Sequence, residues 1–332
     1  MTGVIEPIRV ASDNGGQLQL QRLGAAPTSG PVVLLLHGAM SDSRVFLPAE
    51  HGLARYLAEQ GCCVYVADLR GHGDSQPALG GPQPIRMSDL LQADIPALLE
   101  WLRSEHPDQR LFVVSHGWGG VWLAAALIRK PQLLASICGL VQLGVRRRAL
   151  AGGRFTRFAR RCIWGALASI AGRFKGRIPA CSMGLGSHDE SVDVHTVCLA
   201  WERGEWRDLE DGFDYASALK SLAWPPSLYL AGDRDRVLGH MQDVRRFAHE
   251  LGRHDAQVIL LEKGRGCSRH YGHTDLLTHP QAEQDHFPLI ADWLAQRQQP
   301  THTQELFPRC SAADVEGAAY ITSEEDRPCT ES

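Results

Sequence analysis

Short apolar runs alternate with segments of helical pattern along most of this chain, and this alternation restricts its fold more than any other feature. The runs at residues 31–36, 61–67, 111–114 and 137–143 are apolar almost throughout, which is typical of strands buried on both faces of a sheet. Helical patterns separate these runs. Strands that alternate with helices predict a mainly parallel, doubly wound α/β sheet, whose ligands bind at the carboxyl ends of the strands.

The individual elements are expected from the same patterns. Two short strands surround the turn at residues 13–16, and after residue 224 the alternation resumes. The expected strands, about eight in all, are 8–11, 17–23, 31–36, 61–67, 111–114, 137–143, 228–231 and 258–261. The expected helices are 53–59, 88–103 with an interruption at Pro96, 121–128, 241–251 and 281–295.

The chain divides into four segments by pattern and composition. Residues 1–144 and 225–298 carry the alternation and are expected to form the two parts of one core. Residues 145–224 interrupt the alternation and would form a helical cap, or lid, above the sheet. Residues 299–332 are polar and acidic, with little apolar content, which predicts a disordered tail.

Composition narrows the class of protein. Hydrophobic residues make up 44% of the chain and charged residues 22%, as in ordinary globular proteins, and the net charge of −4 gives no reason to expect a nucleic-acid partner. The first sixteen residues contain no apolar run of the length that a signal peptide needs. The nine cysteines include no Cys-x-x-Cys pair, which argues against a disulfide framework or a cysteine metal site. We therefore expect a cytoplasmic protein.

Five motifs follow the predicted strands in a characteristic order. They are His-Gly-Ala-Met at 37–40, Asp-Leu-Arg-Gly-His-Gly-Asp-Ser at 68–75, Ser-His-Gly-Trp-Gly-Gly at 115–120, Ala-Gly-Asp-Arg-Asp-Arg-Val at 231–237 and Tyr-Gly-His at 271–273. Together they resemble the α/β-hydrolase family, in particular its bacterial lysophospholipase-like and esterase-like members, the serine aminopeptidase type. The resemblance covers roughly residues 30–297. It implies the α/β-hydrolase fold, a helical cap, hydrolysis of carboxylic esters or lipids, and no cofactor.

The motif at 115–120 is similar to the family's nucleophile elbow, a strand–turn–helix usually written Gly-x-Ser-x-Gly. In the register that aligns its histidine and paired glycines, Ser115 and Gly119 take the two positions that must be small. Gly117 then stands where the family has its nucleophilic serine. Glycine accepts a positive φ without steric cost, so this turn can form without the serine. The hydroxyl that would attack the substrate is missing.

A second register makes Ser115 the nucleophile and Gly117 the small residue after it. Val113 would then occupy the small position before the nucleophile, where its branched side chain should clash with the neighbouring helix. This register is the less favourable of the two. Ser115 stays open as the fallback nucleophile.

The other parts of an acyl-transfer site are implied by the resemblance. Asp235 matches the family's acid and His273 its catalytic base; Asp233 suits the acid less well because it lies closer to the preceding strand. The order 117, 235, 273 is the nucleophile, acid, base order of this fold. The backbone N–H groups of Ala39 and Trp118 would form the oxyanion hole.

Residues 146–177 contain ten basic side chains and no acid, and apolar residues recur there at spacings of three and four. A basic amphipathic helix of this kind would cover the pocket as a lid, with its arginines solvated or paired with acids such as Glu202. It could also contact an anionic membrane peripherally, or form a site for an anionic ligand or partner. His270 and His273 are the tightest histidine pair, but they lack a third ligand at helical spacing, so we expect no metal.

Three functional hypotheses remain open from the sequence. The first is an ester or lipid hydrolase whose hydrolysis is weak or absent because Gly117 replaces the nucleophile. The second is a pseudoenzyme that binds a small apolar or acyl-containing ligand, or a protein. The third is an enzyme in which Asp235 and His273 act as a general base without covalent catalysis.

Overall fold

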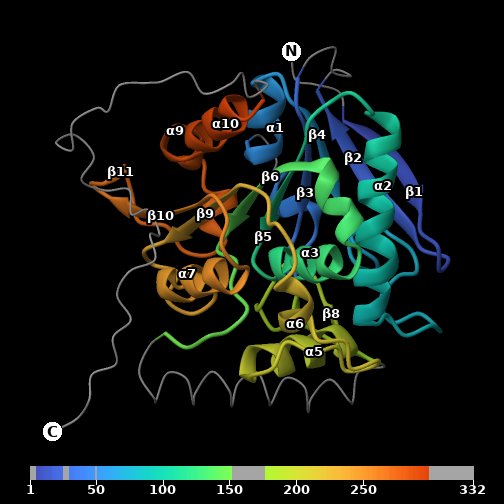
Figure 1. Ribbon diagram of the computed structural model, residues 1–332. Helices are drawn as coiled ribbons and strands as arrows, with labels where there is room; N and C mark the ends of the chain where they lie inside the picture. The colour runs from blue at the N-terminus through green and yellow to red at the C-terminus, as the bar shows by residue number, and fades with distance from the viewer. Residues whose placement is uncertain (1–4, 25–29, 49–50, 152–175, 299–332) are drawn as a thin grey trace, which may run out of the picture.

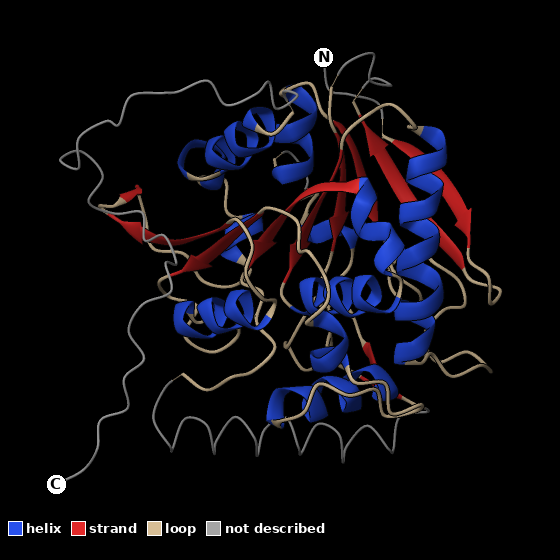
Figure 2. Ribbon diagram, in the orientation of Figure 1, coloured by secondary structure: helices blue, strands red, loops and turns tan. Residues whose placement is uncertain are grey.

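A computed structural model describes residues 5–24, 30–48, 51–151 and 176–298. Within this range the main feature is a nine-stranded sheet in the order β1-β2-β4-β3-β5-β6-β9-β10-β11 (Figures 1 and 2). Its strands are β1 (Glu6–Ala11), β2 (Gln17–Leu23), β3 (Val32–Leu36), β4 (Cys63–Ala67), β5 (Leu111–His116), β6 (Ile137–Leu143), β9 (Ser227–Gly232), β10 (Ala256–Lys263) and β11 (Gly266–Cys267).

The direction of the strands confirms the predicted fold class. From β4 to β11 the paired strands of this sheet are parallel. The hairpin of β1 and β2 is antiparallel and joins β4 antiparallel at one edge. The eight expected strands are all present, and the two-residue β11 adds a short edge strand beyond them.

Helices cover both faces of the sheet, as the apolar strands require. Alternate residues of β3 go to opposite cores: Val33 and Leu35 pack on one side, and Val32, Leu34 and Leu36 on the other. The first side carries α1 (Leu53–Glu59), α8 (Asp275–Thr278), α9 (Ala282–Asp285) and α10 (Phe287–Gln296). The second carries α2 (Ile95–Glu105), α3 (Trp118–Arg129) and α7 (Met241–Glu250).

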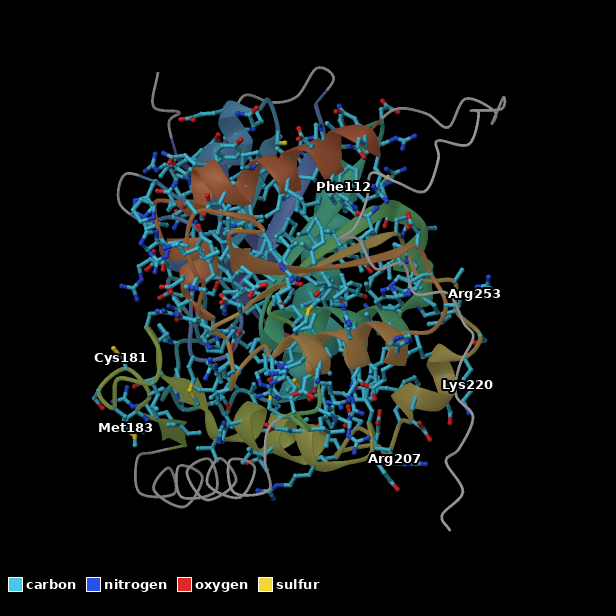
Figure 3. All side chains as sticks on the ribbon, turned by 90° about the vertical axis from the view of Figure 1, so that its left-hand side faces the viewer. Phe112, Cys181, Met183, Arg207, Lys220 and Arg253 are labelled. Carbon is cyan, nitrogen blue, oxygen red and sulfur yellow. The ribbon has the colours of Figure 1, made fainter. Side chains whose placement is uncertain are left out.

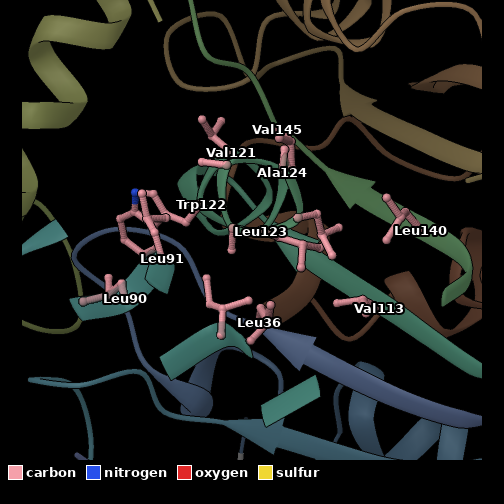
Figure 4. Close-up of a cluster of buried hydrophobic side chains, with 14 of the residues drawn as sticks. Leu36, Leu90, Leu91, Val113, Val121, Trp122, Leu123, Ala124, Leu140 and Val145 are labelled. Atoms are coloured by element: carbon pink, nitrogen blue, oxygen red, sulfur yellow. The ribbon is translucent and has the colours of Figure 1, made fainter. Parts of the chain in front are cut away.

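The helix that follows Gly117, α3, is buried on nearly all sides. Ten of the twelve residues of α3 are buried. Figure 4 shows its side chains Val121, Trp122 and Leu123 packed near the strand residues Leu36 and Val113. A helix held this firmly fixes the position of its own first turn, which is where the candidate site lies.

Two of the expected helices differ in detail from the prediction. The expected helix 88–103 is a π-helical turn at Asp89–Asp94 followed by α2, which extends to Glu105. Pro96 does not end this helix, which continues from the π-helical turn into α2 without a gap. The expected helix 281–295 is broken at His286 into α9 and α10, and Pro288 lies in the first turn of α10, where it is tolerated.

The segment between β6 and β9 was expected to be a cap. Its described part contains the small hairpin of β7 (Arg177–Ile178) and β8 (Glu190–Ser191), then α5 (Val192–Arg203) and α6 (Tyr215–Leu219). The Trp122 indole N–H of α3 donates to the Cys198 sulfur of α5 at 3.4 Å, so this layer packs directly on the core. In Figure 3, Cys181 and Met183 lie at one side of the layer and Arg207 and Lys220 at the other.

Most of the basic segment 146–177 and all of the acidic tail 299–332 lie outside the described residues. The predicted lid helix, its membrane contact and the disorder of the tail therefore stay predictions. At the start of the basic segment, Arg146 Nη1 lies 3.6 Å from Glu202 Oε1, an acid expected to pair with these arginines. Of the helices that the structure describes, none combines the length and apolarity needed to cross a bilayer.

Candidate active site

Gly117 forms the sharp turn between β5 and α3. Its φ of 52° lies in the left-handed region, where a residue with a Cβ is strained. The Gly117 N–H donates to the Leu143 carbonyl at 3.0 Å, which ties the turn to the end of the neighbouring strand β6. The strand–turn–helix geometry of a nucleophile elbow is therefore present here, and the residue at its apex has no side chain.

Close backbone contacts explain why small residues surround this turn. A Cβ on Gly119 would overlap the carbonyl oxygen of His37. A Cβ on Gly38 would lie 2.7 Å from the His116 carbonyl oxygen and 3.2 Å from the Trp118 nitrogen. The loop after β3 and the first residue of α3 consequently lie side by side.

Ser115, the fallback nucleophile, lies in the body of β5 and is fully buried. Its hydroxyl donates to Gln142 Oε1 on β6 at 2.7 Å. The residues that line the cavity above the sheet include Gly117 but not Ser115. This geometry favours the register that places Gly117 at the nucleophile position.

Asp235 and His273 are brought together above the sheet. Asp235 follows β9, His273 follows β11, and His273 Nδ1 lies 2.5 Å from Asp235 Oδ2. Oδ1 of Asp235 accepts from the Leu238 and Gly239 N–H groups at 3.0 and 2.8 Å. Burial alone would raise the pKa of Asp235, but His273 and these two N–H groups outweigh it and lower that pKa. The carboxylate is thus ionised and held in one orientation against the imidazole.

The other nitrogen of His273 faces the elbow. An ideal Cβ on Gly117 would lie 3.0 Å from His273 Nε2. With Nδ1 donating its proton to Asp235, Nε2 is left as the basic nitrogen. The base is therefore aimed at the place where a nucleophile attached to residue 117 would stand.

His116, immediately before the glycine, contacts the same histidine. The two rings lie 4.3 Å apart, and His116 Nε2 donates to the His273 carbonyl at 3.1 Å. Burial and the neighbouring His273 lower the pKa of His116 to about 3, so its ring is neutral at ordinary pH. The motif at 115–120 named this residue only for alignment, and its role in holding His273 needed the structure.

The predicted oxyanion residues Ala39 and Trp118 both line the cavity. Trp118 is the first residue of α3, so its N–H is one of the first-turn groups that have no partner within a helix. The next residue of the loop, Met40, has a φ of 57°, and its N–H donates to Glu190 Oε2 at 2.9 Å. Glu190 comes from the small hairpin of the cap segment and was not singled out in the sequence, because nothing in its local pattern links it to a loop 150 residues away.

Glu190 also forms a buried ion pair with His72, whose Nε2 lies 3.4 Å from Oε1. Burial alone would lower the pKa of His72, but Glu190 outweighs it and raises that pKa. Burial likewise acts to raise the pKa of Glu190, but His72 together with the Met40 and Ser191 N–H groups lowers it. The loop after β3, which carries the predicted oxyanion residue Ala39, is therefore held by the His72–Glu190 pair, which joins the core to the hairpin of β7 and β8.

Asp233, the weaker candidate for the acid, is occupied elsewhere. It forms a short contact with His270 Nδ1, and it accepts from the Tyr271 N–H at 3.2 Å. Neither Asp233 nor His270 lines the cavity. In the described parts of the chain, no group of three histidine, cysteine or acidic side chains is placed to hold a metal ion.

A cavity of about 440 Å³ opens above Gly117 and His273, a size typical of a site for a small ligand. The core contributes the loop after β3, the elbow and the segment after β11, and the cap contributes α5 and the loop before β8. Its apolar lining residues include Met40, Val45, Trp118, Leu185, Leu199 and Leu238. Its charged lining residues are Arg44, Arg146 and Glu202.

Comparisons with known proteins bear on the fold. Residues 28–165, less than half of the chain, match the model of the family described as serine aminopeptidase, S33. A protein phosphatase methylesterase from Candida albicans is 28% identical over 95 residues, which are 29% of this chain but only 24% of that protein.

Solved structures resemble the whole core. An esterase from Thermogutta terrifontis, solved with malate bound, superposes with a TM-score of 0.55 at 17% identity, over 89% of this chain and 100% of that one. A monoacylglycerol lipase from Paleococcus ferrophilus superposes with a TM-score of 0.55 at 18% identity, over 84% of this chain and 99% of that one. At this level of identity the likeness establishes the fold.

Proposed function

Because this chain is an α/β-hydrolase by fold, we propose that it binds acyl-containing ligands in the cavity above Gly117 and hydrolyses esters slowly, without a covalent intermediate. One observation carries the proposal: His273 Nε2 lies 3.0 Å from the Cβ position that Gly117 leaves empty. A base aimed at an absent nucleophile can act only on something that enters the cavity. Water is the simplest candidate.

The proposed reaction uses the groups that are present. His273 Nε2 removes a proton from a water molecule, and the resulting hydroxide attacks the ester carbonyl carbon. The carbonyl oxygen becomes an oxyanion, which the N–H groups of Ala39 and Trp118 would stabilise. Protonated His273 then returns the proton to the leaving alkoxide as the tetrahedral intermediate collapses to acid and alcohol. Asp235 stabilises the imidazolium throughout.

The missing oxygen sets the expected rate. In a serine protease, removal of the nucleophile lowers kcat roughly a million-fold and leaves only about 10³–10⁴ over the uncatalysed reaction. The oxyanion N–H groups and the cavity are retained in this chain, so a residual rate of that order is expected. The site is therefore expected to retain ligand binding to a greater extent than turnover.

The test follows p-nitrophenyl butyrate hydrolysis by the wild-type chain, together with labelling by a fluorophosphonate, which reacts with activated serines. We expect slow hydrolysis without a burst, its loss in His273→Ala, and no labelled residue. A burst, or a fluorophosphonate adduct on Ser115, would show that the chain has a serine nucleophile and would overturn the proposal.

The intact Asp235–His273 pair also suits a second function, in which His273 removes a proton from a carbon acid rather than from water. That reaction needs no nucleophile at residue 117. Two results together would favour this reaction over hydrolysis. The wild-type chain would bind an acyl ligand but show no ester hydrolysis above the buffer rate. It would also exchange an acidic C–H proton of the ligand with deuterated solvent, and His273→Ala would abolish that exchange.

A further inference from the structure

Arg146 is a buried cation that lines the cavity on the side of the cap. Its side chain is 4% exposed, and it follows β6 in the loop that begins at Gly144. Nη2 donates to the Val237 carbonyl at 3.2 Å, and Nη1 lies 3.6 Å from Glu202 Oε1, beyond hydrogen-bond distance. The N–H groups of Nε and Nη1 are buried without an acceptor among the residues that the structure describes.

The next residue in the same loop, Arg147, is also buried but has hydrogen-bond acceptors for all of its guanidinium nitrogens. Arg147 is 3% exposed, and its guanidinium donates to both oxygens of Glu250 and to the carbonyls of Trp201 and Gly204. A guanidinium is always charged and has five N–H donors to satisfy. Arg147 has acceptors on three residues, whereas Arg146, whose side chain lines the cavity, has two buried donor groups without an acceptor among the described residues. Unmet buried donors beside a cavity indicate a ligand with matching acceptors.

The rest of the cavity defines what such a ligand is. Its lining residues Met40, Val45, Leu185 and Leu199 favour an apolar chain. Gly117 and His273 line the same space as Arg146, so one ligand can contact all three. Arg44, the other arginine of the lining, is mostly exposed, and its guanidinium is bound by Asp42.

Resting on the proposed acyl-binding function, we propose that the ligand carries a carboxylate, which binds Arg146, at the end remote from the carbonyl that faces His273. The chemical class is an apolar acyl chain with an anionic end, such as a monoester of a dicarboxylic acid. The carboxylate oxygens supply the acceptors that Nε and Nη1 lack. Glu202 opposes the anion and keeps Arg146 in place when the cavity is empty.

Isothermal titration of monomethyl suberate and dimethyl suberate tests this proposal, because the two esters differ in one charge and have nearly the same shape. For the wild-type chain we expect the monoester to bind about tenfold more tightly, as one charge-assisted contact provides. Arg146→Gln should reduce the ratio of the two Kd values to about one, and Arg146→Lys should restore part of it. Glu202→Gln should raise the ratio, because it removes the opposing charge.

A matched control removes one positive charge from the cap away from the cavity. Arg207 is half-exposed and paired with Asp214, so Arg207→Gln should leave the ratio unchanged. Equal Kd values in the wild type, or a preference for the monoester that survives Arg146→Gln, would overturn the proposal. If Arg146→Gln does not fold, Glu202→Gln provides the test. A ratio of the two Kd values that decreases or stays the same in Glu202→Gln would contradict the proposal.

The outcomes also separate this inference from the proposed function. If dimethyl suberate binds and the monoester binds no better, the cavity is an acyl site without the anionic contact. If neither ester binds the wild-type chain, both proposals fail.

Discussion

Two histidine–carboxylate pairs frame the candidate site, and their difference distinguishes a pair that can transfer a proton from one that holds a loop. His273 and Asp235 lie at the cavity with side chains 16% and 2% exposed, whereas His72 and Glu190 are 1% and 0% exposed. His72 Nδ1 donates to the Arg70 carbonyl at 3.1 Å while Nε2 faces Glu190. Both nitrogens of His72 therefore face acceptors, and His72 does not line the cavity.

His273 differs in one respect that decides its chemistry. Its Nδ1 also faces a carboxylate, but its Nε2 faces the place where the side chain of residue 117 would stand. One nitrogen is thus fixed and the other is available to gain and lose a proton. A buried acid beside a histidine is therefore not in itself a sign of catalysis. What separates the two pairs is whether the second ring nitrogen faces the cavity.

The largest expected effect concerns His273. In a Gly117→Ser background, His273→Ala should lower kcat for p-nitrophenyl butyrate by about 10⁴–10⁶, because the serine would lose its base. His270→Ala is the matched control, since His270, three residues before His273, has its own aspartate, Asp233, and does not line the cavity. A similar loss in both variants would break the distinction between the two neighbouring histidines.

The second effect is on stability and concerns the buried pair. Glu190→Gln should lower the free energy of unfolding by about 1–3 kcal/mol, since it removes the carboxylate that faces His72 Nε2, and burial then favours a neutral His72 without that partner. Denaturant titration measures the change. The control is Glu262→Gln: Glu262 lies near the end of β10, 3.5 Å from the exposed Arg265, so this change should cost less than about 1 kcal/mol. A loss below about 1 kcal/mol for Glu190→Gln would mean that the pair does not fasten the loop.

Gly117→Ser should itself cost stability, by about 1–3 kcal/mol, because serine is strained at a φ of 52°. His273 must also move by a few tenths of an ångström, since the new Cβ would lie 3.0 Å from Nε2. Gly15, whose φ is 80° in an open turn, offers a comparison without a crowded neighbour. If Gly117→Ser proved more stable than the wild type, the elbow geometry described for residue 117 would be wrong.

The smallest effect is a pH dependence of the Glu190 contribution. The raised pKa of His72 makes its contribution complete below its ordinary pKa of about 6.5 and lost as pH rises through the raised value. The lowered pKa of Glu190 makes its contribution complete above about 4.5 and lost as pH falls through the lowered value. The stability difference between wild type and Glu190→Gln should therefore be greatest between about pH 4.5 and 6.5.

The His72 ring lies 4.8 Å from the His37 ring and 5.1 Å from the His188 ring, tilted against both. Burial and His72 lower the pKa of His37 to about 4, so its own effect is to weaken the fold as pH falls below about 6.5. The part of this effect that comes from burial is shared by the wild type and the variant and cancels in the difference. A stability difference that is flat from pH 4 to 8 would contradict the pairing of His72 with Glu190.

The sequence predicted the parts of the molecule that depend on local pattern. The strand order along the chain, the turn at Gly117 and the positions of Asp235 and His273 follow from apolar runs and short motifs, each read within a few residues. The fold is confirmed, while the roles of the site residues stay predictions that the geometry supports.

What the sequence could not predict depends on contacts between distant segments. Glu190 reaches Met40 only because the cap folds back over the loop after β3, and no spacing rule connects the two. Arg146 belonged to a basic run in which all ten side chains looked alike, and only tertiary packing leaves its donors unmet while Arg147 is satisfied. The break at His286 escaped because helical periodicity continues across it, whereas the irregularity expected at Pro96 takes the form of the π-helical turn just before α2.

The central claim is that this site lacks one hydroxyl and is otherwise an ester-hydrolase site. The most direct measurement is kcat for p-nitrophenyl butyrate in the wild-type chain and in Gly117→Ser. We predict a rise of at least about a thousandfold in Gly117→Ser, because a serine at residue 117 would stand within reach of His273 Nε2. A wild-type chain that is already fast, and that loses its activity in Ser115→Ala, would contradict the claim and make Ser115 the nucleophile.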